Sequence, residues 1–106
     1  MNIVEFQSWV ETGWTRKVDS EQDNLRELAV MSLGLPGEVG EVIEHIKKEI
    51  RGDGPANRDA LLLEIGDVLH YLCRIASHYE LEMDSVIEAN INKIEARRGK
   101  RKWETK

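Results

Sequence analysis

The chain has 106 residues, enough for one domain and too few for two, and 41% hydrophobic residues can supply a packed core. A formal net charge of -5 argues against non-specific binding of nucleic acid, which needs a basic surface. One cysteine excludes an intrachain disulfide, and no apolar run approaches the ~20 residues of a membrane span or forms an N-terminal signal, so we expect a soluble cytoplasmic protein.

The first predicted element is a short helix over residues 3–12, with apolar positions at helical spacing and Gly13 as its stop. Two tryptophans accompany it. Trp9 is expected to pack in the core or against another subunit, because large aromatic side chains are usually buried in one of these ways. Trp14 lies in a polar stretch and is the better candidate for a platform on which a nucleobase stacks.

A long second helix is predicted over residues 24–51, with Ser20 as a preceding cap and Gly52 at its end. Pro36 and the three glycines around it oppose helix formation in the middle of this stretch. Two interpretations stay open. The chain either breaks into two helices near Leu35, or forms one kinked helix whose glycines let another backbone or a ligand come close.

Two further helices follow, over residues 58–79 and about 84–98. Gly99 is expected to end the last one, which leaves residues 99–106 as a basic tail. Nothing reads as a strand. Cys73 falls in an apolar segment and is expected to be a small core residue. The sequence therefore predicts a single all-α domain over residues 1–106, a four-helix bundle with its core at about 25–98.

Four acidic residues stand out, Glu38 with Glu41 in the second helix and Glu64 with Asp67 in the third. Residues three apart share a helix face, so two adjacent helices would bring four carboxylates together at the rim of the bundle. Such a group repels itself unless a cation intervenes. An all-oxygen site suits Mg2+, with Mn2+ as a substitute. The alternative is that these acids simply face water.

The fourth helix carries a polar and basic stripe beside an apolar one. Asn90, Lys93 and Arg97 recur at i, i+3 and i+7 and lie on one face, as a clamp for a metal-bound polyphosphate would require. Zinc is not expected, because there is one cysteine and the three histidines, His45, His70 and His78, are scattered on polar faces where we expect surface residues.

Residues 33–42, 64–72 and 90–93 together resemble the MazG nucleotide pyrophosphohydrolases of the all-α NTP pyrophosphatase superfamily. The shared pattern is Glu-x-x-Glu, a gap, and then Glu-x-x-Asp, and the resemblance extends over about residues 25–98. Pro36 departs from the pattern, since many members carry alanine there.

This resemblance implies hydrolysis of a nucleoside triphosphate between the α- and β-phosphates, with Mg2+ held by the four acids. Glu38 or Glu41 would also act as the general base, and Lys93 and Arg97 would stabilise charge on the leaving pyrophosphate. It also implies a homodimer or a dimer of dimers with the site near a subunit interface. Limited core size supports self-association.

Three alternatives remain beside this hypothesis. Within the superfamily, the substrate could instead be a dUTP-like nucleotide or phosphoribosyl-ATP. A second class is a non-catalytic helical interaction module, which would have no need of the stripe formed by Asn90, Lys93 and Arg97. A basic arm that binds nucleic acid is weaker, because the rest of the chain is acidic, so we expect no specific nucleic-acid partner and no membrane partner.

Overall fold

The computed structural model describes residues 1–13 and 20–104, with side chains described up to residue 99. All regular structure in these residues is helical, which confirms the predicted all-α fold. Four helices follow one another along the chain: α1 (Ile3–Thr12), α2 (Glu21–Arg51), α3 (Arg58–His78) and α4 (Met83–Glu104).

Side chains cap the first three helices where the sequence places short polar residues. Asn2 accepts from the backbone N–H of Glu5, and the Glu5 side chain accepts from the backbone N–H of Asn2 in return. The Ser20 hydroxyl oxygen accepts from the backbone of Asp23, so α2 begins three residues earlier than the apolar pattern alone predicts. α2 ends at Gly52, whose φ of 99° is a left-handed conformation that glycine adopts without strain.

Pro36 lies inside α2 without ending it. The helix runs from Glu21 to Arg51 as a single element, so the interpretation with two helices broken near Leu35 is wrong. A proline removes one backbone hydrogen bond, because it has no N–H, but packing along the rest of a 31-residue helix can compensate for that loss.

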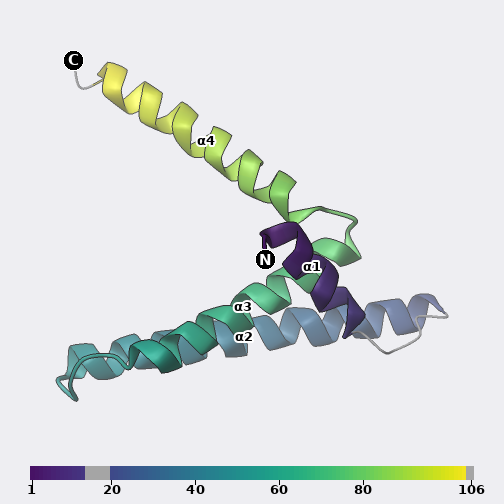
Figure 1. Ribbon diagram of the computed structural model, residues 1–106, viewed down its shortest axis with the longest axis horizontal. Helices are drawn as coiled ribbons and strands as arrows, with labels where there is room; N and C mark the ends of the chain where they lie inside the picture. The colour runs from purple at the N-terminus through teal and green to yellow at the C-terminus, as the bar shows by residue number, and fades with distance from the viewer. Residues whose placement is uncertain (14–19, 105–106) are drawn as a thin grey trace.

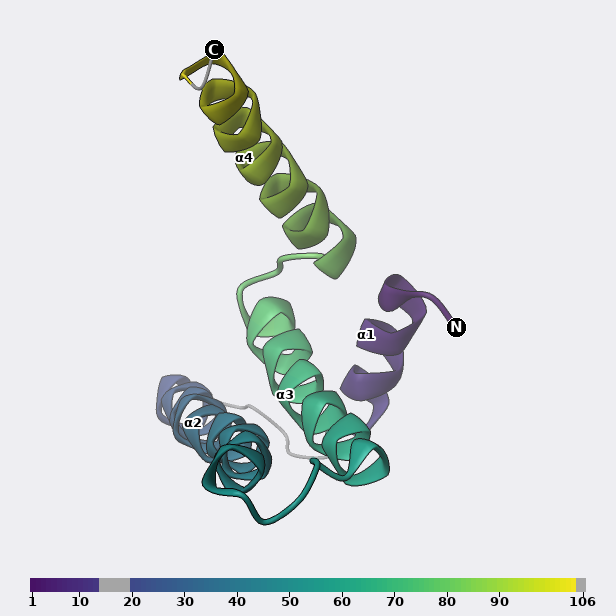
Figure 2. The same ribbon diagram turned by 90° about the vertical axis from the view of Figure 1, so that its left-hand side faces the viewer.

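α2 and α3 lie side by side in opposite directions, and α1 packs against α3 (Figure 1, Figure 2). The buried core sits where α1, α3 and the start of α4 meet and consists of Val10, Cys73, Ala76 and Met83. Cys73 is fully buried, as expected for a small core residue, and burial raises the pKa of its thiol.

α4 leaves the other three helices instead of lying along them (Figure 1, Figure 2). Its first turn is fixed to α1 by the buried Gln7, whose Oε1 accepts from the backbone N–H of Met83 at 2.8 Å. The predicted end at Gly99 is wrong, because α4 continues to Glu104. A glycine costs a helix only ~1 kcal/mol, and the Lys and Arg residues after it favour helix.

Many apolar side chains of the described residues remain exposed. α2 and α3 each carry a stripe of apolar residues at helical spacing, and parts of both stripes are exposed, so one chain does not bury them fully in a core. The reason is that α4 does not cover them. The larger exposed residues of these two stripes and of α4 are Val39, Ile43, Ile46, Ile50, Ile65, Leu72, Ile87 and Ile91. Among the described residues, no helix has both the length and the apolar character needed to cross a membrane.

Candidate metal centre

Three of the four predicted acids come together between α2 and α3. Glu38 from α2 and Glu64 and Asp67 from α3 each offer a carboxylate oxygen, and these oxygens lie within 4.8 Å of one another. Glu38 and Glu64 are half-buried and Asp67 is exposed, so the group sits at the rim of the helix pair, open to solvent. A set of converging carboxylate oxygens fits a hard divalent cation such as Mg2+, which also retains water ligands.

Close packing of α2 against α3 positions this acid group. Gly34 lies one turn before Glu38, and Tyr71 lies one turn after Asp67. A Cβ atom on Gly34 would lie 2.6 Å from Cε1 of Tyr71, so only glycine lets the ring occupy its present place. Because the helices are antiparallel, the contact between Gly34 and Tyr71 brings Glu38 level with Asp67 on the next turn.

A buried ion pair holds the same two helices further along. Glu27 on α2 is nearly fully buried, and its carboxylate lies 3.5 Å from a guanidinium nitrogen of Arg74 on α3. Arg74 also lies over the ring of Tyr71, with its guanidinium carbon 5.9 Å from the ring centroid. The ion pair between Glu27 and Arg74, together with the contact of Tyr71 with Gly34, sets the register between α2 and α3.

The electrostatics of the acid group show mutual repulsion. Partial burial raises the pKa of Glu38 above its ordinary value, and the carboxylates of Asp67, Glu64 and Glu41 raise it further, as does a hydrogen bond with Asp67. Among the described residues, no lysine or arginine forms an ion pair with Glu38, Glu64 or Asp67. A cation bound here would relieve this repulsion.

Glu41 occupies a different place from the other three acids. It is exposed on α2, one turn after Glu38, and lies outside the close group of oxygens. Its charge still contributes to the raised pKa of Glu38. Glu41 is therefore near the group without converging on the same point.

The predicted phosphate-binding residues do not join the acid group within one chain. Asn90, Lys93 and Arg97 are exposed on α4, which extends away from α2 and α3 (Figure 1). Trp14, the predicted base platform, lies outside the described residues. The structure thus brings together residues from α2 and α3 and leaves those of α4 apart.

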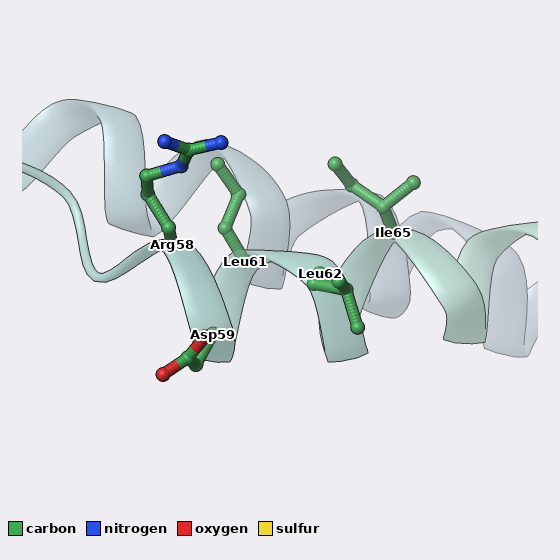
Figure 3. A pocket seen from close by; sticks show the side chains of 5 residues that line it. All are labelled: Arg58, Asp59, Leu61, Leu62 and Ile65. Carbon is green, nitrogen blue, oxygen red and sulfur yellow. The ribbon is translucent and has the colours of Figure 1, made fainter.

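A separate, mainly apolar hollow lies at the start of α3. Figure 3 shows Arg58, Leu61 and Ile65 on one side of α3, with Asp59 on the other. Leu62 completes the lining. None of the four predicted acids lines this hollow, and Asp59 is its one carboxylate, so its chemistry does not suit a metal ion.

Sequence reasoning missed several residues that shape the site. The pairing of Glu27 with Arg74 joins positions 47 apart in the chain, and helical spacing carries no signal for such a contact. His70 was expected on the surface but is half-buried among the rings of Phe6, Trp9 and Tyr71. Gly34 did carry a signal for the close contact between α2 and α3, because a glycine inside a helix suggests that another group comes close.

Comparison with known proteins adds two findings. The family model of the MazG nucleotide pyrophosphohydrolase domain matches residues 26–102. The Gene 37 protein of Mycobacterium phage L5 is 35% identical over 80 residues, which covers 72% of this chain and 70% of the phage protein. No solved structure matches the chain.

Proposed function

Because the chain belongs to the MazG nucleotide pyrophosphohydrolase family, we propose that it is a Mg2+-dependent nucleoside triphosphate pyrophosphohydrolase. The reaction cleaves between the α- and β-phosphates of an NTP or dNTP and yields the nucleoside monophosphate and pyrophosphate. The convergence of Glu38, Glu64 and Asp67 on one point carries the proposal beyond the family assignment.

In this proposal Glu38, Glu64 and Asp67 hold the metal, which when bound neutralises phosphate oxygens and makes a water molecule more acidic. Glu41 lies one turn away, is exposed and is outside the close group. It is the carboxylate best placed to accept the proton of the attacking water, since its oxygens are not drawn into the group. Glu41 therefore takes the role of general base, and Glu38 that of ligand.

Self-association forms the second part of the proposal. The described part of one chain buries only five hydrophobic residues, while α2, α3 and α4 all expose large aliphatic side chains. A second copy of the chain would cover these surfaces and enlarge the core. We propose that the protein forms a homodimer or a dimer of dimers.

The second copy also supplies the phosphate clamp. Asp67 lies eleven residues before the end of α3, about 17 Å along the helix axis. α4 then leads further away from the acids (Figure 1). Lys93 and Arg97 of the same chain therefore lie too far away to touch a polyphosphate at the acid group. The corresponding residues of α4 in another copy are assigned that role, and their charge complements the acids.

The experiment that tests this function measures pyrophosphate release from the common NTPs and dNTPs, with Mg2+ and with EDTA, and identifies the nucleotide product. We expect monophosphate and pyrophosphate with Mg2+ only. Glu38→Gln should reduce the rate at least about a hundredfold, because it removes a ligand, whereas Glu88→Gln, which changes an exposed acid on α4, should not. Diphosphate and orthophosphate as products would contradict the cleavage site. No turnover of any nucleotide would favour a non-catalytic interaction module.

A further inference from the structure

A side-chain amide on α1 pairs with the backbone that joins α3 to α4. Gln7 is 7% exposed, and its Nε2 donates to the carbonyl of Leu81 at 2.8 Å while its Oε1 accepts from the N–H of Met83 at 2.8 Å. The same nitrogen donates to the Ser77 hydroxyl at 3.1 Å. Because a planar amide holds its donor and acceptor in fixed directions, these bonds orient the connection as well as holding it.

The connection is also fixed through its own backbone. The N–H of Leu81 donates to the carbonyl of Ala76 at 2.8 Å, and the N–H of Glu80 donates to that of Ser77 at 3.0 Å. Glu80 has a φ of 56° and is the one left-handed residue other than glycine in the described part of the chain. A residue with a side chain keeps this conformation where surrounding contacts hold it, and Gln7 supplies the hydrogen bonds that come from α1.

Beyond its first turn, α4 depends little on its own chain. Met83 is the one buried residue of α4 among the side chains that the structure describes, up to residue 99. Both views show α4 leaving the other helices from this end (Figure 1, Figure 2). Lys93 lies ten residues after Met83 and Arg97 fourteen, about 15 and 21 Å along the helix axis. A tilt of about 10° at the first turn would therefore move Lys93 and Arg97 by about 3–4 Å, more than an ion pair with a phosphate tolerates.

We propose that Gln7 is a positioning residue for the phosphate clamp, an inference that rests on the proposed function. It fixes the angle at which α4 leaves its own chain, and this angle brings Lys93 and Arg97 to the acid group of a second copy. Gln7 acts through α4 and contacts neither metal nor substrate. A preset angle lowers the conformational entropy that is lost when two copies associate, and it places the clamp for the leaving pyrophosphate.

The proposal predicts that a change at Gln7 harms the site of the other copy. In a heterodimer with Glu38→Gln in one chain and Lys93→Ala in the other, the intact site takes its clamp from the Glu38→Gln chain. Gln7→Met keeps a side chain of similar length, removes the three hydrogen bonds and is added to either chain. In the Glu38→Gln chain it should lower kcat/KM about tenfold or more, because the clamp is displaced, and in the Lys93→Ala chain it should lower it less than about twofold.

Each heterodimer is the control for the other, because both contain one Gln7→Met chain and lose the same stability. An equal loss of activity in the two would overturn the proposal, since it would mean general damage to the fold. Equal retention would also overturn it, because the clamp would then be independent of Gln7. So would an inactive heterodimer without Gln7→Met, since the clamp would then come from the same chain as the acids.

A distance measurement separates failure of this inference from failure of the proposed function. Spin labels at Glu11→Cys in α1 and Asn92→Cys in α4, two exposed positions, report the angle of α4. An excess of unlabelled protein restricts the measured distances to one chain, and the fully buried Cys73 stays unlabelled. The distribution of distances should be narrow with Gln7 and broader with Gln7→Met, because the first turn of α4 is then held less firmly.

An unchanged distribution would overturn the inference, whatever the activity. If the wild type hydrolyses no nucleotide but the distribution broadens, the proposed reaction fails while Gln7 still orients α4. If the distribution broadens and the two Gln7→Met heterodimers are equally active, the reaction stands and the positioning role of Gln7 fails.

Discussion

Gly34 shows how one small residue positions a site that it does not belong to. Its missing side chain admits the ring of Tyr71, and the resulting contact between α2 and α3 lies one turn from Glu38 and Asp67. Gly37, also in α2, has nothing within 4 Å of the place where a Cβ would lie. The two glycines therefore differ in what a methyl group would meet.

Gly37→Ala should stabilise the protein by about 1 kcal/mol, because alanine is the better helix former. Gly34→Ala should instead lower stability relative to Gly37→Ala by about 1–3 kcal/mol, since the methyl group has to displace Tyr71. Urea unfolding at one protein concentration measures both. Equal stabilisation by the two substitutions would show that the ring moves freely and does not set the approach of the helices.

The start of α4 depends on a single buried amide on α1. The Gln7 side-chain nitrogen donates to the Ser77 hydroxyl and to the Leu81 carbonyl, at 3.1 and 2.8 Å, while its oxygen accepts from Met83. Glu80, between α3 and α4, has a φ of 56°, a left-handed conformation that turns the chain at the end of α3. Gln7 thus links three consecutive parts of the chain and sets where α4 begins.

Gln7→Leu should cost about 2–4 kcal/mol of unfolding free energy, because it leaves the buried N–H of Met83 without its acceptor and the Leu81 carbonyl without its donor. Hydrogen exchange at the Met83 amide should accelerate in parallel. Ser8→Ala, at the neighbouring exposed position, is the control and should change neither quantity. An unaltered exchange rate in Gln7→Leu would mean that other contacts fix the start of α4.

At the scale of the whole molecule, the proposed function requires a second copy of the chain both to cover apolar surface and to complete the site. Its α2–α3 pair and its α4 each expose aliphatic side chains, and the acids lie far from the basic stripe of α4. In the proposed homodimer a second copy would remedy both, because it would cover apolar surface and bring its own Lys93 and Arg97 to the acid group. The same contact would then provide stability and catalysis.

Mixed oligomers test whether the clamp comes from another copy. A heterodimer with Glu38→Gln in one chain and Lys93→Ala in the other, isolated through two different tags, should retain about half of the wild-type rate, because one of its two sites is intact. Each variant alone should be nearly inactive. If acids and clamp came from one chain, the heterodimer would be as inactive as its parents.

The control for this experiment pairs Glu38→Gln with Asp67→Asn. Both changes affect the same group of acids, so neither site of that heterodimer is intact and no recovery should occur. Recovery here would show that the assay detects re-formed wild-type protein or a site of another composition.

The sequence by itself determined the helices and the faces on which their residues lie, because helix formation follows local rules. Helical spacing, the cap at Ser20 and the stop at Gly52 predicted four helices and most of their ends, and spacing of three residues placed each pair of acids on one face. Motif order also predicted the family, which the match over residues 26–102 confirms. These features depend on neighbours within one or two turns, so they can be read from the chain.

Contacts between distant residues were decided only by the tertiary structure. Tertiary packing alone shows that Glu38 converges with Glu64 and Asp67 while Glu41 lies outside, and that α4 departs from the acids. It also shows that parts of the apolar stripes of α2 and α3 stay exposed in one chain. Helical periodicity identifies the face on which a residue lies, but not which other surface covers that face. That choice depends on packing between helices, here through Gly34 with Tyr71, Glu27 with Arg74 and the buried Gln7.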